Sequence, residues 1–390
     1  MIGPCPACGG AGGRVFHQQD GIPSHSCLLL DDRRAAERFP TGALRLTFCD
    51  QCGFIWNGAY NPSLAAYSTD YEETQGFSPR FRGFAHDLAS RLVDQYDIHD
   101  KDILEIGCGK AEFLALLCEI GVNRGIGIDP SVIPDRVNSP ARDRMRFIQD
   151  YYRPDHGDLP ADVVVCRHTL EHIADVGQLM AVVRSSIPPD RDPLVVFELP
   201  DVGRVLRETA FWDIYYEHCS YFSPGSLTRL FRSSGFDVVD LTMEFDDQYI
   251  VVVGRPAAGR DRRFDAEETV GELAGDVAAF ERSFAKQLDH WSGEVASARA
   301  RGDRVVIWGG GSKGVSFLTT LGLGDEIAGV VDINPHKQGK FMAGTGHEVV
   351  GPERLRDLRP GLVIAMNPVY LHEIGASLRE LGVDARLTGV

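Results

Sequence analysis

Glu105-Ile106-Gly107-Cys108-Gly109 closes one apolar run of this 390-residue chain, and Gly125-Ile126-Gly127-Ile128-Asp129 closes the next. Each run predicts a strand, and the first glycine pair predicts a sharp turn from strand into helix. Positions without a side chain let the backbone approach a ligand, and the free N–H groups of the helix then face it. Asp129 is placed to accept hydrogen bonds from both hydroxyls of a ribose. Together the two segments predict a nucleoside site on an open parallel sheet.

The spacing of the glycines indicates which nucleoside is bound. A dinucleotide site usually shows G-x-G-x-x-G, but Glu112 occupies the position of the third glycine here. The order E-x-G-x-G resembles motif I of class I S-adenosylmethionine methyltransferases, which bind no pyrophosphate. This resemblance implies S-adenosylmethionine as the cofactor, with a dinucleotide or a ligand-free turn as alternatives. The implied cofactor-binding residues are Glu105, Gly107, Gly109, Asp129 and Asp150, the last near the adenine amino group.

Composition restricts the class of partner. The formal charge of −16 argues against a broad nucleic-acid surface, so we expect a small-molecule substrate and no nucleic acid. No apolar run is long enough to span a bilayer, and the N-terminus lacks a charged-then-apolar secretory pattern. We therefore expect a cytoplasmic protein without a membrane partner, either a monomer or a homodimer, with two or three domains.

Two C-x-x-C pairs stand near the N-terminus, and each is followed by a glycine. They supply four thiolates, enough for a tetrahedral zinc with no open position. A redox C-x-x-C is the alternative, but that chemistry needs one pair rather than two matched ones. We therefore predict a structural zinc ion in a zinc-binding domain over residues 1–62, with the ligands Cys5, Cys8, Cys49 and Cys52.

Residues 63–256 alternate helical and strand patterns, which is typical of a doubly wound α/β sheet with ligands at the carboxyl ends of its strands. The pattern predicts a helix over 87–96 and strands over 102–106, 161–166 and 194–198. Arg167–His172 follows the predicted fourth strand, at the edge of the nucleoside crevice. There His168 could face the site of methyl transfer, and His172 either faces the cofactor or caps the following turn.

The stretch from Phe211 to Ser223 is dense in aromatic residues with titratable groups among them. Apolar walls shift the pKa of enclosed acids and bases, as general acid–base catalysis requires. If this segment is helical, Tyr215 and His218 lie on one face. A structural hydrogen-bond cluster is the alternative interpretation.

The order of two C-x-x-C knuckles, E-x-G-x-G, Y-x-E-H-x-S-Y-F-S and a second Gly-rich domain resembles the sugar C-methyltransferases of deoxysugar biosynthesis. Those enzymes act on thymidine-diphosphate ketosugars, and the resemblance covers nearly the whole chain. It implies an active site with Tyr215, Glu217 and His218, a covering segment with Tyr71, and a substrate contact at Tyr221. The family's late H-G-G-S-x-R-like segment is replaced here by E-F-D-D-Q-Y at residues 244–249, which favours a related branch with another acceptor.

The C-terminal part repeats the strand, glycine loop and helix order. A helical connector is expected over 257–302, followed by a strand at 304–308 and G-G-G-S-K-G at 309–314. In the sugar enzymes a similar domain helps to form the acceptor cleft, so the resemblance implies a Rossmann-like substrate-binding domain over 303–390. An NAD site and a ligand-free turn remain as alternatives. The candidate substrate contacts are Ser312, Lys313, Asp332 and Lys337.

These patterns together predict an S-adenosylmethionine-dependent C-methyltransferase that acts next to a carbonyl on a polar, nucleotide-linked sugar. His218 would remove the α-proton, with Glu217 orienting or charging it, and Tyr215 would donate to the developing enolate oxygen. His168 is an alternative base. Transfer to oxygen or nitrogen of a natural-product or polysaccharide precursor, an NAD-dependent sugar oxidoreductase and a non-catalytic zinc scaffold that binds nucleotide-sugars are the competing hypotheses.

Overall fold

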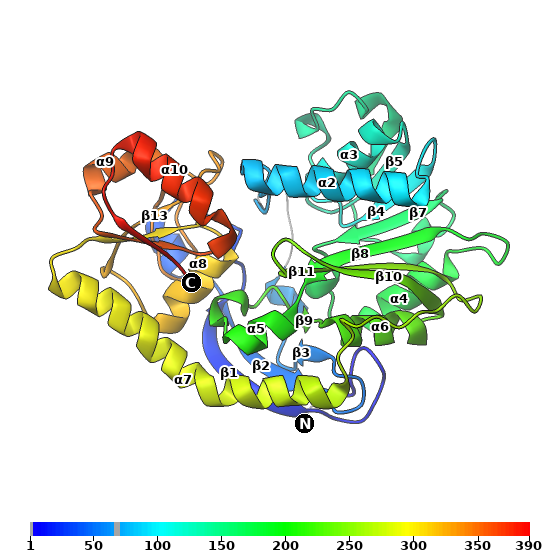
Figure 1. The fold of residues 1–390 in the computed structure, drawn as a ribbon, viewed down its shortest axis with the longest axis horizontal. Helices are drawn as coiled ribbons and strands as arrows, with labels where there is room; N and C mark the ends of the chain where they lie inside the picture. Colours follow the sequence, from blue (N-terminus) through cyan, green and yellow to red (C-terminus); the bar gives the residue numbers. More distant parts are fainter. Residues whose placement is uncertain (1–2, 66–70) are drawn as a thin grey trace.

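The computed structural model describes residues 3–65 and 71–390. Its strands form a four-stranded, a seven-stranded and a five-stranded sheet. The seven-stranded sheet and its helices make one lobe, and the five-stranded sheet makes the other (Figure 1). The four-stranded sheet lies beneath both, and the long helix α7 (Val270–Ala300) runs along its outer side toward the C-terminal lobe.

The N-terminal sheet is antiparallel and is completed by a strand from much later in the chain. Its order is β1 (Arg14–Pro23), β2 (Thr41–Phe48), β3 (Ile55–Asn57) and β9 (Ser220–Tyr221), with helix α1 (Arg33–Glu37) between β1 and β2. In β9, Tyr221 pairs with Ile55 and Ser220 pairs with Trp56. The aromatic Phe211–Ser223 segment is thereby held against the N-terminal sheet.

In the large sheet, the strand that leads into the glycine segment at 107–109 and the strand that contains the glycines at 125–127 lie side by side. The order is β10 (Phe236–Glu244), β11 (Tyr249–Pro256), β8 (Leu194–Pro200), β7 (Val163–Arg167), β4 (Asp102–Ile106), β5 (Arg124–Ile128) and β6 (Met145–Ile148). The sequence predicts an open parallel sheet, and the structure departs from this at β11, which is antiparallel to both neighbours. The cause is the short turn between β10 and β11, because only antiparallel strands can be joined so closely.

Helices cover both faces of this sheet, as the doubly wound interpretation predicts. The first face carries α2 (Pro79–Tyr96) and α3 (Glu112–Ile120), and the opposite face carries α4 (Val176–Ser185) and α6 (Pro224–Ser233) (Figure 1). Helix α2 begins earlier than residue 87, because Ser78 caps it by accepting from the Phe81 N–H at 3.2 Å. The Ser78 hydroxyl also donates to Glu373 at 2.9 Å, so the start of this helix contacts the C-terminal lobe.

The C-terminal lobe is a parallel sheet whose central strand is β12 (Val305–Trp308). Its other strands are β13 (Ile327–Val331), β14 (Val349–Val350), β15 (Leu362–Ala365) and β16 (Arg386–Gly389), and its helices are α8 (Ser312–Leu321), α9 (Leu355–Leu358) and α10 (Leu371–Leu381). Gly309 has a φ of 126°, a conformation that favours glycine, at the turn from β12 into the loop before α8.

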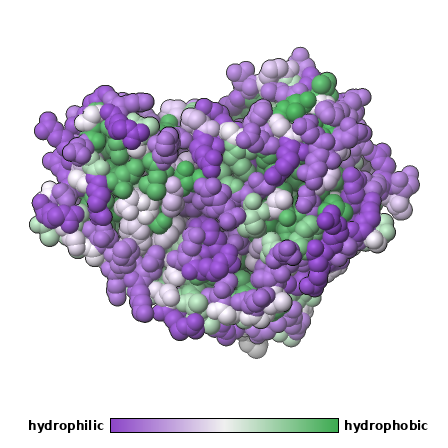
Figure 2. Space-filling view, viewed as in Figure 1, coloured by the Kyte–Doolittle hydropathy of each residue, from purple (hydrophilic) through white to green (hydrophobic). Residues whose placement is uncertain are grey.

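One apolar core joins the N-terminal sheet, α5 (Val202–Glu208), α7 and the C-terminal lobe. Phe280 of α7 is fully buried in it, with ring contacts to Phe16 and Phe284 at centroid distances of 6.1 and 5.5 Å. This shared core holds the two lobes in one arrangement. Figure 2 shows that hydrophilic residues cover most of the visible face, with a notch between the lobes at the top. In the described part of the chain, no helix combines the length and apolarity needed to cross a membrane.

Replacement of Phe280 tests this shared core. We expect Phe280→Ala to lower the free energy of unfolding by about 3–5 kcal/mol, because it removes a fully buried ring and leaves a cavity. The control Arg282→Ala, at an exposed position of the same helix, should change it by less than about 0.5 kcal/mol. Urea unfolding of both variants provides the measurement, and equal effects would contradict the role of the core.

Candidate active site

A cavity of about 520 Å³ lies between the two lobes. Its lining combines the carboxyl ends of β4, β5 and β7, the Tyr71–Ser78 segment, the Tyr215–His218 turn and the glycine loop that leads into α8. Parallel strands open such a crevice at their carboxyl ends. Residues from both glycine motifs and from the Y-x-E-H block therefore face one enclosed space.

The glycine elbow after β4 has the backbone that only glycine adopts without strain. Gly107 and Gly109 have φ angles of 69° and 51°. A Cβ on Gly107 would lie 2.1 Å from Thr169 Oγ1, so no larger residue fits there. Asp129 ties the elbow down by accepting from the Gly109 N–H at 2.9 Å and from the Ser131 N–H at 2.6 Å. The Asp129 carboxylate lines the cavity but already serves three protein donors, because the Ser131 hydroxyl also donates to it at 2.6 Å.

Two buried carboxyl groups beside this elbow have an oxygen without a hydrogen-bond partner among the described residues. They are Glu105 and Glu73, and both line the cavity. Burial raises the pKa of Glu105 to about 8, with Arg167 opposing the rise, and it raises the pKa of Glu73 to about 7. Lys110 Nζ forms an ion pair with Glu73 Oε2 at 3.8 Å. Unpaired buried acceptors are costly, so the Glu105 oxygen fits a ligand that carries a positive charge and N–H donors.

The other predicted cofactor contacts also line the cavity, but they differ in their partners and in their exposure to solvent. Tyr71 and His172 line the cavity, and Tyr71 forms a β-bridge with Leu28. His172 Nδ1 lies 3.1 Å from the carbonyl oxygen of Glu217. Asp150 also contributes to the lining, but its carboxylate pairs with Arg153 at the exposed rim.

His168 does not have the environment of a general base. Its Nε2 lies 3.0 Å from Glu198 Oε1 and its Nδ1 lies 3.7 Å from Glu171 Oε1. Burial alone would lower the pKa of His168, but the two carboxylates raise it to about 9. The raised pKa favours a protonated imidazole at neutral pH and so disfavours His168 as the alternative base.

Glu198 belongs to a buried ion pair behind His168. Arg167 contacts both of its oxygens, with Nη2 3.0 Å from Oε1, and its guanidinium lies over the Phe113 ring at 3.9 Å. Burial opposes ionisation, but Arg167 and His168 lower the pKa of Glu198 to about 2. This carboxylate therefore remains charged across the whole physiological range.

Tyr215 and His218 form a contact pair in the cavity. The Tyr215 hydroxyl lies 3.1 Å from His218 Nε2, and the ring centroids are 4.2 Å apart. The conditional prediction of a helix is wrong, because only Phe211–Asp213 is helical and Tyr216 and Glu217 form a turn. The two rings meet through that turn instead.

Glu217 does not orient His218. Its Oε1 lies 2.9 Å from His25 Nδ1, and its Oε2 accepts from the Ser26 N–H at 3.0 Å. The turn sends the two neighbouring side chains in different directions, so His218 lines the cavity and Glu217 does not. Ser26 Oγ in turn donates to Ser312 Oγ at 2.7 Å, which links this carboxylate to the C-terminal lobe.

The remaining predicted substrate contacts are engaged with protein groups. Lys313 Nζ lies 2.9 Å from Asp213 Oδ1, and burial lowers the pKa of Lys313. Lys337 Nζ lies 3.5 Å from Asp332 Oδ2. These four residues line the cavity together with Ser312, whereas Tyr221 does not, because its hydroxyl donates to the carbonyl of Tyr215 at 3.2 Å.

The sequence predictions missed several cavity residues. Gln248 and Asn367 exchange two amide hydrogen bonds of 2.9 and 3.0 Å across the two lobes. Gln248 stands within the 244–249 segment, so the departure from the family motif was the available signal. Glu73, Glu171, Arg204 and Asp213 also line the cavity without having been predicted.

The four N-terminal cysteines come together as predicted. Their sulfur atoms lie within 4.8 Å of one another, with Cys5–Cys52 and Cys8–Cys49 separations of 3.7 Å. The two knuckles have matching turns, because Gly9 N–H donates to Cys5 and Gly53 N–H donates to Cys49 at 2.8 and 2.9 Å. Four thiols in this arrangement fit the donor set of a closed tetrahedral metal site.

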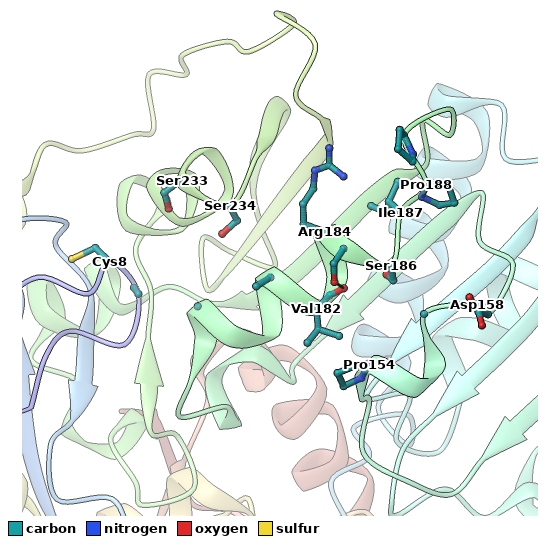
Figure 3. Close-up of a pocket in the computed structure, with 16 residues that line it drawn as sticks. Cys8, Pro154, Asp158, Val182, Arg184, Ser186, Ile187, Pro188, Ser233 and Ser234 are labelled. Atoms are coloured by element: carbon teal, nitrogen blue, oxygen red, sulfur yellow. Dashed lines mark hydrogen bonds between the residues drawn. The ribbon is translucent and has the colours of Figure 1, made fainter.

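A second, more open groove of about 940 Å³ lies outside the cleft between the lobes. It is lined by the Cys8 loop, α4 with the following turn, and the end of α6. Figure 3 shows its labelled side chains spread around the groove rather than converging on one point. Arg184 there donates to the carbonyl of Gly235 at 3.3 Å. The predicted catalytic and cofactor-binding residues instead line the cavity between the two lobes, apart from Glu217.

Comparison with known proteins identifies the class. A methyltransferase domain matches residues 79–241, and a C-methyltransferase C-terminal domain matches residues 262–384. C-methyltransferase NovU of Streptomyces niveus is 30% identical over 304 residues, 74% of this chain and 71% of the relative. Similar solved structures include 1,6-didemethyltoxoflavin-N1-methyltransferase of Burkholderia thailandensis (18% identity, 45% of this chain and 79% of that chain, TM-score 0.33). Magnesium protoporphyrin IX methyltransferase of Synechocystis is another (12%, 46% and 84%, TM-score 0.35).

The domain matches and the relative together confirm the predicted enzyme class: this protein is an S-adenosylmethionine-dependent methyltransferase. More particularly, the chain belongs to the C-methyltransferase family that includes NovU. Membership of an enzyme family sets aside the hypothesis of a non-catalytic scaffold. The glycine loop at 309–314 falls within the C-methyltransferase C-terminal domain, which disfavours the NAD-dependent oxidoreductase.

The charge on His168 can be tested directly. We expect its imidazole to titrate near pH 9, and Glu198→Gln to lower that pKa by at least about one unit, because a buried carboxylate is removed. A raised pKa stabilises the fold below pH ~6.5, and this stabilisation is lost as the pH rises through 9. NMR of histidine-labelled protein, assigned with His168→Gln, gives the measurement. Titration near pH 6.5 would contradict the ion pair.

Proposed function

We propose that this enzyme transfers a methyl group to a carbon next to a carbonyl on a polar, nucleotide-linked sugar. The observation that supports this most is the single cavity, which brings the E-x-G-x-G elbow, the Tyr215–His218 pair and the second glycine loop together. The family's C-methyltransferase relatives favour carbon over oxygen or nitrogen as the methyl acceptor. A carbon acceptor requires a base to remove a proton and a donor to stabilise the resulting oxyanion.

His218 has the properties of that base. Burial lowers the pKa of His218 well below its usual value, and the nearby His172, His168 and Lys313 lower it further. The imidazole is therefore neutral at physiological pH and can accept a proton from the acceptor carbon. Tyr215 has the complementary property, because burial raises the pKa of its hydroxyl well above the usual range. It remains a phenol and can donate to the enolate oxygen.

The cofactor supplies an electrophilic methyl group when it is bound. Its adenosine and methionine parts would lie along the elbow, with Asp129 toward the ribose and Glu105 toward the ammonium group. The unpaired buried oxygen of Glu105 and the close fit at Gly107 are the features that support this placement. Asp150 and Tyr71 line the cavity at positions that fit the adenine amino group and a cover over the site. The protein would then need to hold the acceptor carbon in line with the methyl group for transfer.

The C-terminal loop offers a site for an anionic part of the acceptor. Helix α8 begins at Ser312, and Lys337 Nζ lies 3.4 Å from where a Cβ on Gly311 would stand. Backbone N–H groups at a helix start, together with a lysine, attract phosphate oxygens. Gln248 lies in the 244–249 segment, where the sugar enzymes carry the H-G-G-S-x-R-like motif. Its neutral amide pairs with Asn367 and favours hydroxyl contacts to the acceptor.

Replacement of His218 tests the proposed reaction. His218→Ala should reduce solvent exchange of the acceptor's α-proton by about 10²–10⁴-fold, because a positioned base is removed, while S-adenosylmethionine binding is kept. Proton NMR in D2O with a thymidine-diphosphate 4-ketosugar measures the exchange, and titration calorimetry measures the binding. Undiminished exchange would exclude His218 as the base. A new carbon–oxygen bond in the product would instead favour O-methyl transfer.

We also infer that Cys5, Cys8, Cys49 and Cys52 hold a structural zinc ion. The matched knuckles and the sulfur separations support this, and four thiolates leave no open position for a substrate. The knuckles contact the methyltransferase lobe, because Gly177 N–H donates to Pro6 and Arg229 Nε donates to Cys52 at 3.1 and 2.8 Å. A bound metal would therefore stabilise the docking of the N-terminal region.

Metal analysis tests the zinc site. We expect the purified protein to contain about one zinc per chain, and Cys49→Ser to lose that zinc and melt at a lower temperature, because a metal ligand is removed. The control Cys27→Ser, at a buried cysteine outside the cluster, should retain the metal. Wild-type protein free of zinc after expression in zinc-supplemented medium would contradict the site.

A further inference from the structure

Glu171 is a buried carboxylate that the mechanism above leaves without a role. It lies in the short 3-10 turn Leu170–His172 that follows β7, and its side chain is only 3% exposed. It lines the cavity, and its Oε2 has no hydrogen-bond partner among the described residues. A buried carboxyl oxygen in this state requires an explanation, because desolvation without a partner is costly.

The surroundings of Glu171 are imidazoles from two segments. One of its oxygens lies within 4.8 Å of a ring nitrogen of His172 and of His218. Its Oε1 also lies 3.7 Å from Nδ1 of His168, which already carries its proton. Glu171 therefore lies close both to His168, whose raised pKa favours the protonated form, and to His218, the proposed base.

We propose that Glu171 is the counter-charge that stabilises protonated His218 during proton abstraction; this rests on the proposed function. The carbon–hydrogen bond of the acceptor breaks, its electron pair remains in the enolate, and the proton forms an N–H bond on His218. Glu171 exchanges no proton in this step and acts through His218, so it is a positioning residue. It takes the role that the sequence predicted for Glu217, whose carboxylate is occupied by His25 and Ser26.

The buried charges support this assignment. Arg167, Glu198, His168 and Glu171 alternate in sign along one line of contacts. A proton on His218 adds a positive charge at the end of that line, next to a negative one. The charged groups other than Glu171 that act on His218 in the described part of the chain are His172, His168 and Lys313, and all three oppose its protonation. An unpaired buried charge is strongly disfavoured.

The groups that face His218 come from several elements. Tyr215 and Tyr221 belong to its own segment, and His172 packs edge-on against its ring at a centroid distance of 4.8 Å. Lys313 of α8 and His168 contribute positive charge from farther away. Among these and Glu171, Glu171 is the only carboxylate, so its removal should affect the protonation of His218 more than any of the other changes.

Glu171→Gln tests the proposal with two readouts. The first is NMR titration of the His218 imidazole in the intact protein with S-adenosylmethionine bound, which needs no acceptor. The second is the pH profile of α-proton exchange in the thymidine-diphosphate 4-ketosugar. We expect Glu171→Gln to move the midpoints of both toward acid by at least about one pH unit, and to lower the plateau exchange rate by about 10–100-fold.

Two variants separate this role from a structural one. Glu171→Asp should restore part of both effects, because it returns the charge. Glu119→Gln, a matched control for an exposed carboxylate, should leave the midpoints in place. Unchanged midpoints in folded Glu171→Gln, with exchange still abolished in His218→Ala, would overturn this proposal alone. Exchange that survives in His218→Ala would overturn the proposed function instead. If the wild-type protein binds a second divalent metal and Glu171→Gln loses it, Glu171 is a metal ligand. That result would also overturn the counter-charge role.

Discussion

One buried carboxylate joins three parts of the chain, and the geometry of the site depends on it. The side chain of Glu217 contacts His25 and Ser26 of the N-terminal region, and Ser26 reaches Ser312 at the start of α8. The carbonyl of the same residue lies 3.1 Å from His172. Burial makes each of these contacts strong, because no water competes for them. These three parts of the chain are therefore aligned beside the cavity between the lobes.

Two buried histidines of the site have opposite protonation states, because the groups around them differ in charge. His168 lies between two carboxylates and remains charged, whereas His218 lies among aromatic and cationic neighbours and remains neutral. His168 also has a φ of 47°, a strained conformation for a non-glycine residue that costs about 1–3 kcal/mol. Strain of this kind is retained where the surroundings hold a side chain in a required place.

Local patterns predicted a large part of this fold and site. The glycine elbow, the two cysteine knuckles and the second glycine loop depend on short spacings along the chain, and all three appear in the structure. The Tyr215–His218 contact was also expected, although a turn brings it about rather than a helix. The antiparallel β11 was missed, because strand direction depends on the connection rather than on apolar composition.

By itself the sequence determined the enzyme class and the α/β order, because glycine spacing, cysteine spacing and strand patterns are local properties. Only the tertiary structure decided which acid faces which base. Lys313 meets Asp213 rather than an open site, and Glu171 rather than Glu217 stands near His218. Glu171 and His218 are 47 positions apart in the chain, and Asp213 and Lys313 are 100 positions apart. Packing between distant segments therefore sets the directions and the burial of these side chains. No spacing rule within one segment contains that information.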